Sequence, residues 1–132
     1  MSELAALRFL VVDDFRAMRR IVRMLLEEIG CTSVEEAGDG VAALALLQSQ
    51  PFDVVISDIG MPAMSGLELL AAIKADPELN HLPVLMVSAE ARKDEIVEAA
   101  QNGAAGYLVK PFGREVLEKK LSTLIAKAVT TA

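Results

Sequence analysis

Five short apolar runs, each followed by a segment with helical spacing, are the feature that most limits how this chain can fold. An alternation of strand-like and helix-like segments is typical of a parallel sheet whose connecting helices cover both of its faces. The sequence therefore predicts an α/β fold, a single-domain, doubly wound, five-stranded parallel sheet with five helices. The expected strands are Phe9–Val12, Ser33–Ala37, Asp53–Ser57, Val84–Ser88 and Tyr107–Lys110.

The composition of the runs indicates which strands lie inside the sheet. Four of them consist almost entirely of Val, Ile, Leu and Met, as strands covered on both faces must. We expect these four to be interior strands. Ser33–Ala37 reads Ser-Val-Glu-Glu-Ala, and two charges in so short a run predict a strand at the edge of the sheet.

The helices differ in how clearly the sequence defines them. In the first, apolar residues recur at helical spacing until Gly30, and we expect their face to pack on the sheet. These residues are Met18, Ile21, Val22, Leu25, Leu26 and Ile29. The third helix has a capping-box spacing from Ser65 to Glu68 and ends near Asp76, before Pro77. The others lie at about Val41–Gln48, about Lys93–Gln101 and from Leu117 to Ala128.

The length of 132 residues suits one domain and leaves no room for a second catalytic or DNA-binding domain. We expect one domain over residues 1–132, with about 1–7 and 129–132 as terminal segments. Acidic residues outnumber basic ones by 19 to 13, which argues against nucleic acid and suits the binding of cations or basic protein surfaces.

Cys31 and His81 are the only residues of their types. A single Cys makes no internal disulfide, and together the two supply too few ligands for a zinc site, which favours a reducing compartment. The sequence opens without a basic, apolar leader, and no run approaches about 18 apolar residues. We therefore expect a cytoplasmic protein with no membrane insertion.

Polar residues occur at the ends of four of the five expected strands. Asp13 and Asp14 follow the first strand, Asp58 follows the third, Ser88 ends the fourth and Lys110 ends the fifth. Right-handed crossovers bring the carboxyl ends of parallel strands to one edge of the sheet, where ligands bind in such folds. We therefore expect these side chains to converge.

Three carboxylates at one edge would repel one another unless a cation compensates them. Oxygen ligands in a cleft that water can reach favour Mg²⁺, which accepts one or two carboxylates together with phosphate oxygens. Beside Mg²⁺ and the Lys110 ammonium, Asp58 could attack a phosphoryl group and carry it as an acyl phosphate. Ser88 could donate a hydrogen bond to the same group.

Each of these residues also has an ordinary structural explanation. Asp14 could cap the first helix, and Asp58 could be a turn residue. Lys110 has apolar neighbours, so its ammonium needs a carboxylate partner or must reach solvent. Ser88 and Tyr107, taken singly, fit the border of a core. Their shared position at the ends of separate strands favours the functional interpretation.

With these residues in view, the chain resembles the receiver domain of two-component response regulators, above all the stand-alone chemotaxis members, almost from end to end. The matching segments are 9–15 (FLVVDDF), 34–37, 39–40, 55–58 (VISD), 61–62, 66–70, 83–90, 99–101 and 106–112 (GYLVKPF). The resemblance implies the flavodoxin-like strand order 2-1-3-4-5. It also implies that the chain takes a phosphoryl group from a phosphohistidine on a CheA-type histidine kinase.

The resemblance assigns a role to each residue of the acidic cluster. Asp58 would accept the phosphoryl group. Asp14, Asp58 and the backbone carbonyl of Gly60 would bind Mg²⁺ directly, and Asp13 would act through a water molecule.

The resemblance further implies a conformational switch. Ser88 and Lys110 would contact the phosphoryl group, and the Lys110–Pro111 bond would be cis. The Ser88 hydroxyl would move toward the phosphoryl group as the Tyr107 ring turns inward, and phosphorylation would shift the population toward that arrangement.

An output face follows from the same resemblance. Ile96, Tyr107 and Lys120 would bind an N-terminal segment of the flagellar switch protein FliM. Ile96 is explained equally well as a core residue of a weakly patterned helix.

Three positions depart from the usual pattern of the chemotaxis members. Ser88 stands in place of Thr and keeps the hydroxyl, but it lacks the methyl group that restrains the rotamer. Gly60 stands in place of Asn, which leaves the lifetime of the acyl phosphate open. Ile59 stands in place of Trp, so we expect no fluorescence quenching on metal binding.

The sequence therefore predicts a monomeric, Mg²⁺-dependent phosphoacceptor that relays chemotaxis signals to the flagellar motor and has no turnover substrate of its own. A CheZ-type phosphatase is a further candidate partner. The alternative within the family is a stand-alone receiver in a phosphorelay or another two-component pathway with a non-flagellar target.

Two other classes share parts of this pattern. A flavodoxin-like electron carrier has the same topology, but the sequence lacks a phosphate-binding loop after the first strand and a Trp to stack on a flavin. A phosphatase with an aspartate nucleophile would also use Mg²⁺, but Asp13-Asp14 is not an Asp-x-Asp arrangement and the chain leaves no room for a cap domain.

Overall fold

The computed structural model describes residues 3–61, 64–90 and 92–131, and the expected strands and helices all occur in this part of the chain. The strands are β1 Arg8–Val12, β2 Ser33–Ala37, β3 Val54–Asp58, β4 Val84–Ser88 and β5 Gly106–Val109. The helices are α1 Arg16–Ile29, α2 Gly40–Ser49, α3 Gly66–Ala75, α4 Lys93–Gln101 and α5 Arg114–Thr131, with a short 3-10 turn, Glu3–Ala6, before β1.

A single parallel sheet contains all five strands in the order β2-β1-β3-β4-β5, which confirms the expected topology. Phe9 of β1 lies between Val34 of β2 and Val54 of β3, and this register brings the carboxyl ends of the strands to one edge. The charged strand β2 lies at the edge of the sheet, as predicted.

The prediction that the fifth strand is an interior strand was wrong. β5 forms the second edge of the sheet, and its last residue, Val109, is 38% exposed. An apolar run indicates that helices cover the two faces of a strand. The run does not indicate whether a further strand pairs with the outer edge of that strand. Composition therefore could not distinguish β5 from the interior strands.

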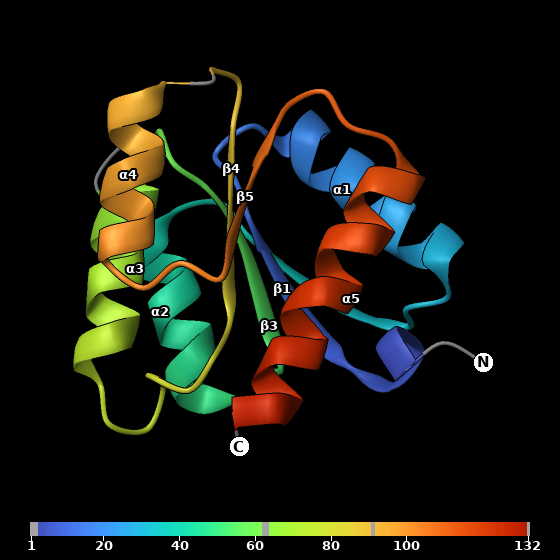
Figure 1. Ribbon diagram of the computed structural model, residues 1–132, viewed down its shortest axis with the longest axis horizontal. Coiled ribbons are helices and arrows are strands. Elements are labelled where there is room, and N and C mark those ends of the chain that lie inside the picture. The colour runs from blue at the N-terminus through green and yellow to red at the C-terminus, as the bar shows by residue number, and fades with distance from the viewer. Residues whose placement is uncertain (1–2, 62–63, 91, 132) are drawn as a thin grey trace.

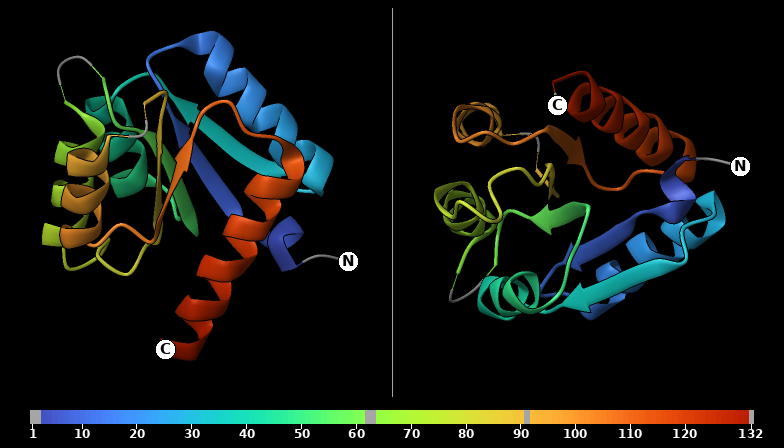
Figure 2. Two further views of the ribbon diagram at one scale, coloured as in Figure 1. Left: turned by 45° about the horizontal axis from the view of Figure 1, so that its top comes forward. Right: turned by 90° about the horizontal axis from the view of Figure 1, so that it is seen from below.

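Helices cover both faces of the sheet and divide the core into two clusters. In Figure 1, α1 and α5 lie on one face, and α2, α3 and α4 lie on the other. The first cluster joins the sheet to buried residues of α2, α3 and α4, among them Leu47, Leu70 and Ala99. The second joins it to α1 and α5 through residues such as Leu26 and Leu121. Figure 2 shows the same layering from two further directions.

Helix α1 covers less of the sheet than its sequence pattern predicts. Val22, Leu25 and Leu26 are buried, but Ile21 is 42% exposed and does not pack on the sheet as expected. The apolar arc of this helix is wider than the face that the sheet and α5 can cover. The helix ends where expected, at Gly30, whose φ of 115° places it in the left-handed region that glycine adopts without strain.

The expected capping box begins α3. The Ser65 hydroxyl accepts a hydrogen bond from the Glu68 backbone N–H at 3.1 Å, and the Glu68 carboxylate accepts one from the Ser65 backbone N–H at 3.0 Å. This reciprocal pair fixes the point where the chain turns from the end of β3 into α3. Among the described helices, none is long and apolar enough to cross a membrane.

Candidate functional site

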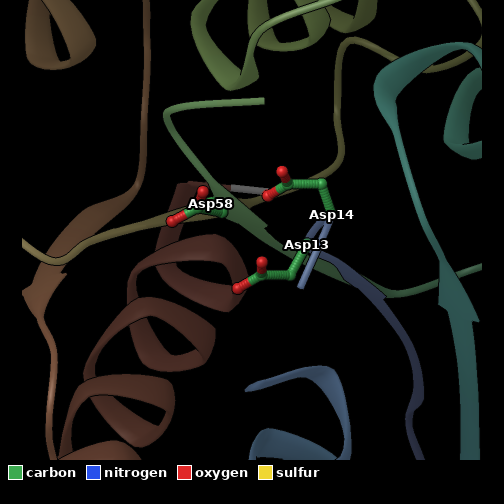
Figure 3. Close-up of side chains that lie close together, drawn as sticks. All are labelled: Asp13, Asp14 and Asp58. Carbon is green, nitrogen blue, oxygen red and sulfur yellow. The ribbon is translucent and has the colours of Figure 1, made fainter. Parts of the chain in front are cut away.

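The residues predicted from separate strand ends meet at the carboxyl edge of the sheet. Asp13 and Asp14 follow β1, Asp58 ends β3, Ser88 ends β4 and Lys110 follows β5. Figure 3 shows the three carboxylates gathered where β1 and β3 end, and each offers an oxygen within 4.8 Å of the others. The convergence that strand topology predicted is therefore present.

Lys110 is the cation of this cluster. Its Nζ lies 2.8 Å from Asp13 Oδ2 and 2.9 Å from Asp58 Oδ1, and its side chain is only 12% exposed. Its ammonium therefore has two carboxylate partners and does not need to reach solvent. The Lys110–Pro111 peptide bond is cis, as the family resemblance implied.

Burial and charge determine the protonation of the Lys110–Asp58 pair. Burial acts to lower the pKa of Lys110, but hydrogen bonds to Asp13 and Asp58 outweigh it, and the pKa is raised above its ordinary value. Burial raises the pKa of Asp58, and the neighbouring acids Asp13 and Asp14 add to the rise that the Lys110 hydrogen bond opposes. Lys110 therefore stays charged. Its single positive charge does not balance the negative charge of the carboxylates around it.

Asp14 does not cap helix α1. The residue at the N-cap position is Phe15, which makes no capping hydrogen bond with its side chain, and the Asp14 side chain is exposed. The Phe15 backbone N–H instead donates to Asp13 Oδ1 at 2.9 Å. The capping explanation for Asp14 is thus wrong.

The chemistry of the cluster fits a hard divalent cation. Asp13, Asp14 and Asp58 supply oxygen atoms, with Asp14 on the solvent side, and no His or Cys belongs to the group. Oxygen ligands on an open site that admits water suit Mg²⁺. The Gly60 carbonyl remains a predicted direct ligand beside Asp14 and Asp58, and Gly60 lines the same cleft.

The loop that carries Gly60 is held at both of its ends. Ile59 and Met61 are buried at 3% and 8% exposure, and the Gly66 backbone N–H donates to the Ile59 carbonyl at 2.8 Å. A Cβ on Gly66 would overlap the main-chain oxygen of Asp58, so only glycine lets α3 start this close to the end of β3. By contrast, a Cβ on Gly60 would meet nothing within 4 Å.

Ser88 and Tyr107 are linked through one short segment. Ser88 is 8% exposed, and its hydroxyl accepts a hydrogen bond from the Glu90 backbone N–H at 3.2 Å. The Tyr107 hydroxyl donates to the Glu90 carbonyl at 3.1 Å, while its half-buried ring packs against the core beneath α4. The predicted switch pair is therefore connected through the backbone of Glu90.

An open cleft of about 650 Å³ surrounds the cluster. Its lining includes the predicted residues and several that the sequence analysis missed, namely Phe15, Met18, Glu90, Arg92 and Glu95. Phe15 is 61% exposed at this cleft. Arg92 and Glu95 lie in the segment after β4, and their position after a strand that ends at the site is the one signal that could have indicated them.

The predicted output residues lie away from the cleft, on β5 and its flanking helices. Ile96 is half-buried on α4, where Ala99 is the one fully buried residue of the helix, so Ile96 is not a core residue. The Lys120 stem passes over β5, within 3.4 Å of a Cβ built on Gly106. Lys120 thus lies beside the residue that precedes Tyr107, and Ile96 is on the helix on the other side of β5.

Comparison with known proteins defines the class. Residues 9–122 match the family described as the response regulator receiver domain. The chain belongs to this family.

Within the family, the chain is similar to chemotaxis proteins. It is 50% identical to the chemotaxis protein CheY of Pseudomonas aeruginosa over 92% of this chain and 98% of that protein. It is 49% identical to the chemotaxis protein CheY-3 of Vibrio cholerae over 92% of this chain and 93% of that protein. The chain is therefore a CheY-like chemotaxis response regulator receiver domain.

Solved structures give the same result for the fold. The chemotaxis response regulator CheY4 of Vibrio cholerae superposes with a TM-score of 0.82 at 39% identity, over 89% of this chain and 98% of that one. A response regulator receiver domain protein from Clostridium thermocellum gives a TM-score of 0.85 at 27% identity, over 96% and 99% of the two chains.

Proposed function

We propose that this protein accepts a phosphoryl group on Asp58 from a CheA-type histidine kinase, in a Mg²⁺-dependent reaction, and signals to the flagellar motor switch. The observation that carries the proposal is the position of Asp58. It lies between the Lys110 ammonium at 2.9 Å and a pair of further carboxylates that can hold a cation. Two positive charges beside one carboxylate are what a phosphoryl acceptor needs.

The Asp58 carboxylate faces the lysine through one of its oxygens. Oδ1 lies 2.9 Å from the Lys110 ammonium. In the proposed reaction an Asp58 oxygen forms the new bond to phosphorus as the bond between phosphorus and the donor histidine nitrogen breaks. The imidazole then leaves with the bonding electron pair and takes a proton from solvent.

Lys110 and Ser88 would hold the transferred group. Lys110 already lies beside the acceptor, so its charge can compensate that of the new phosphoryl oxygens. The Ser88 hydroxyl accepts its hydrogen bond from Glu90, which leaves its own proton free to donate to a phosphoryl oxygen. When bound by Asp14, Asp58 and the Gly60 carbonyl, with Asp13 acting through water, Mg²⁺ would supply further charge neutralisation.

A route from the site to the output face supports the signalling part of the proposal. A Ser88 hydroxyl that turns toward a phosphoryl group gives up the Glu90 backbone N–H. The Tyr107 hydroxyl donates a hydrogen bond to the carbonyl of the same Glu90. A shift of Glu90 would therefore release the Tyr107 ring. Ile96 and Lys120 lie on α4 and α5, the two helices on either side of the strand that carries this ring. Phosphorylation would act by favouring one of two arrangements.

Labelling of Asp58 tests the acceptor. The protein incubated with a small acyl phosphate and Mg²⁺ should gain one phosphoryl group that is released by hydroxylamine. Asp58→Asn should abolish labelling, because an amide cannot form the acyl phosphate. Asp53→Asn is the matched control, since Asp53 lies just before the opposite end of the same strand. Equal labelling of Asp58→Asn and the unchanged protein would refute the assignment.

The partner is tested separately. A FliM N-terminal peptide should bind more tightly after phosphorylation, and the gain should be lost in Ile96→Asp while labelling of Asp58 is retained. The rival assignment is a stand-alone receiver in a phosphorelay or another two-component pathway. In that case the peptide binds no better after phosphorylation, and a histidine phosphotransfer protein exchanges phosphate with Asp58.

The remaining parts of the proposal follow from this role. The protein acts in the cytoplasm as a monomer, where a CheZ-type phosphatase can limit the signal. It acts as a switch, because the phosphoryl group ends on its own Asp58 and is lost to water. No small-molecule substrate is turned over.

A further inference from the structure

Asp13 is held at every polar atom by four different parts of the fold. Its backbone N–H donates to the Ala37 carbonyl at 3.2 Å. Its side-chain oxygens accept from Phe15 at 2.9 Å and from Lys110 at 2.8 Å. Its backbone carbonyl accepts a bond of 2.7 Å from Arg19 Nη1, the shortest of the four. That last contact has no part in the proposed phosphoryl chemistry.

Arg19 is itself fixed from a second side. Its Nε lies 3.3 Å from Glu36 Oε1 on the edge strand β2, and the two side chains are only 17% and 19% exposed. Glu36 is held in turn by Arg23, whose Nη1 lies 2.9 Å from the other carboxylate oxygen. The guanidinium of Arg19 therefore connects the edge strand to the turn that carries the acidic cluster.

The Asp13 carbonyl belongs to the peptide group that joins Asp13 to Asp14. Because that group is planar, a bond to its oxygen also fixes the direction in which the chain enters Asp14. The Asp14 side chain is exposed, and no hydrogen bond or ion pair with the described residues orients it otherwise. The direction of the peptide plane therefore helps to set the Asp14 Cα–Cβ bond from which the carboxylate projects.

We propose that Arg19 is a positioning residue for the cation site: by fixing the Asp13–Asp14 peptide plane it directs the Asp14 carboxylate toward the ion. This inference rests on the proposed Mg²⁺ site. Arg19 touches neither the phosphoryl group nor the ion. Lysine is a poor substitute, because one ammonium lacks the planar fork that reaches Glu36 and the Asp13 carbonyl together.

Arg23 provides a matched control within the same network. Both arginines bind Glu36 from α1, but Arg23 extends to Glu27 at 3.7 Å, whereas Arg19 extends to the Asp13 carbonyl. Removing either one deletes a positive charge from α1 and a partner from Glu36. Only removal of Arg19 releases the Asp13–Asp14 peptide.

The direction of the change in Mg²⁺ affinity distinguishes a positioning role of Arg19 from an electrostatic one. Deleting a positive charge near an acidic cluster should by itself make Mg²⁺ bind more tightly. Loss of positioning should make it bind more weakly, by about tenfold if Arg19 acts like other residues that orient metal ligands. A weaker affinity in Arg19→Met thus has no electrostatic explanation.

Titration calorimetry with MgCl₂ tests the inference on the whole protein. We expect a Kd about tenfold higher in Arg19→Met, an intermediate Kd in Arg19→Lys, and a change of no more than about twofold in Arg23→Met. An unchanged or lower Kd in Arg19→Met, or an equal rise in Arg23→Met, would overturn it. If Arg19→Met does not fold, the comparison of Arg19→Lys with Arg23→Lys decides by the same criteria.

The same titration distinguishes the two proposals. If the unchanged protein binds no Mg²⁺ at all, the proposed cation site itself fails. If the unchanged protein binds Mg²⁺ and Arg19→Met binds it equally well, only the positioning role fails.

Discussion

Lys110 and Asp58 are in contact although their strands are not neighbours in the sheet. The Lys110 Nζ lies 2.9 Å from Asp58 Oδ1, and β4 runs between β3 and β5. The lysine therefore reaches across the end of a strand to compensate charge at the centre of the edge. This contact holds the site together before any cation or phosphoryl group is present.

Replacing Lys110 should destabilise the folded protein, because the lysine compensates the charge of the acidic cluster. Lys110→Met leaves Asp13 and Asp58 as buried carboxylates without their cation, and we expect the free energy of unfolding without Mg²⁺ to fall by about 2 kcal/mol. Addition of Mg²⁺ should recover part of the loss. Urea denaturation with and without Mg²⁺ measures both effects. Lys119→Met, on the exposed side of α5, is the control and should change little.

Asp14 should have opposite effects with and without the cation. Asp14→Asn removes a charge that acts on Asp58, so the Tm without Mg²⁺ should rise, by about 2 °C. In the unchanged protein, Mg²⁺ at ten times its Kd should add about 1.4 kcal/mol of stability, because it binds only the folded state. Asp14→Asn should lose most of this gain. Thermal melts over a Mg²⁺ series would contradict the ligand role if both proteins responded alike.

Gly66 should tolerate no side chain. In Gly66→Ala the new Cβ would overlap the Asp58 carbonyl oxygen and press on Ile59, so the start of α3 must move. We expect a loss of about 2 kcal/mol in the free energy of unfolding and slower phosphorylation of Asp58. Gly113→Ala is the control, because a Cβ there meets nothing within 4 Å, and it should cost less than about 1 kcal/mol. Equal losses would show that steric overlap is not the cause.

Much of the fold could be predicted because its signals are local. The alternation of strands and helices, the capping box at Ser65 and the stop at Gly30 each depend on a few neighbouring residues. The error at β5 and the exposure of Ile21 have a common cause. An apolar side chain indicates that something could cover it, but the sequence does not say how many elements are present to do so.

The part of the candidate site that lies at the strand ends could also be predicted from the sequence. Strand topology brings the ends of β1, β3, β4 and β5 together, so Asp58 and Lys110 could be placed near each other from their positions alone. The cleft lining beyond the strand ends could be predicted only as the segment that follows β4, because the path of the chain decides which of its residues, such as Arg92, reach the site. The contact of Arg19 with the Asp13 carbonyl also escaped prediction, since a backbone acceptor leaves no signal in the sequence.

Glu36 should make stability depend on pH in acid. Burial acts to raise its pKa, but the hydrogen bonds from Arg23 and Arg19 outweigh burial and hold the pKa below its ordinary value of 4.5. A lowered pKa means that the ionised form stabilises the fold above that ordinary value, and that this contribution is lost as the pH falls through the native value. Glu36→Gln should therefore be less stable than the unchanged protein at neutral pH, by about 1 kcal/mol, and equally stable well below pH 4.

Urea denaturation from neutral to acid pH tests whether the stabilities of Glu36→Gln and the unchanged protein become equal in acid. Glu27→Gln is the control, because Glu27 is 58% exposed in its contact with Arg23 and should leave the pH dependence nearly unchanged. Parallel curves for Glu36→Gln and the unchanged protein would mean that the Glu36 carboxylate is no better stabilised in the folded state than in the unfolded one. The ion pair that holds Arg19 against the Asp13 turn would then contribute no net stability.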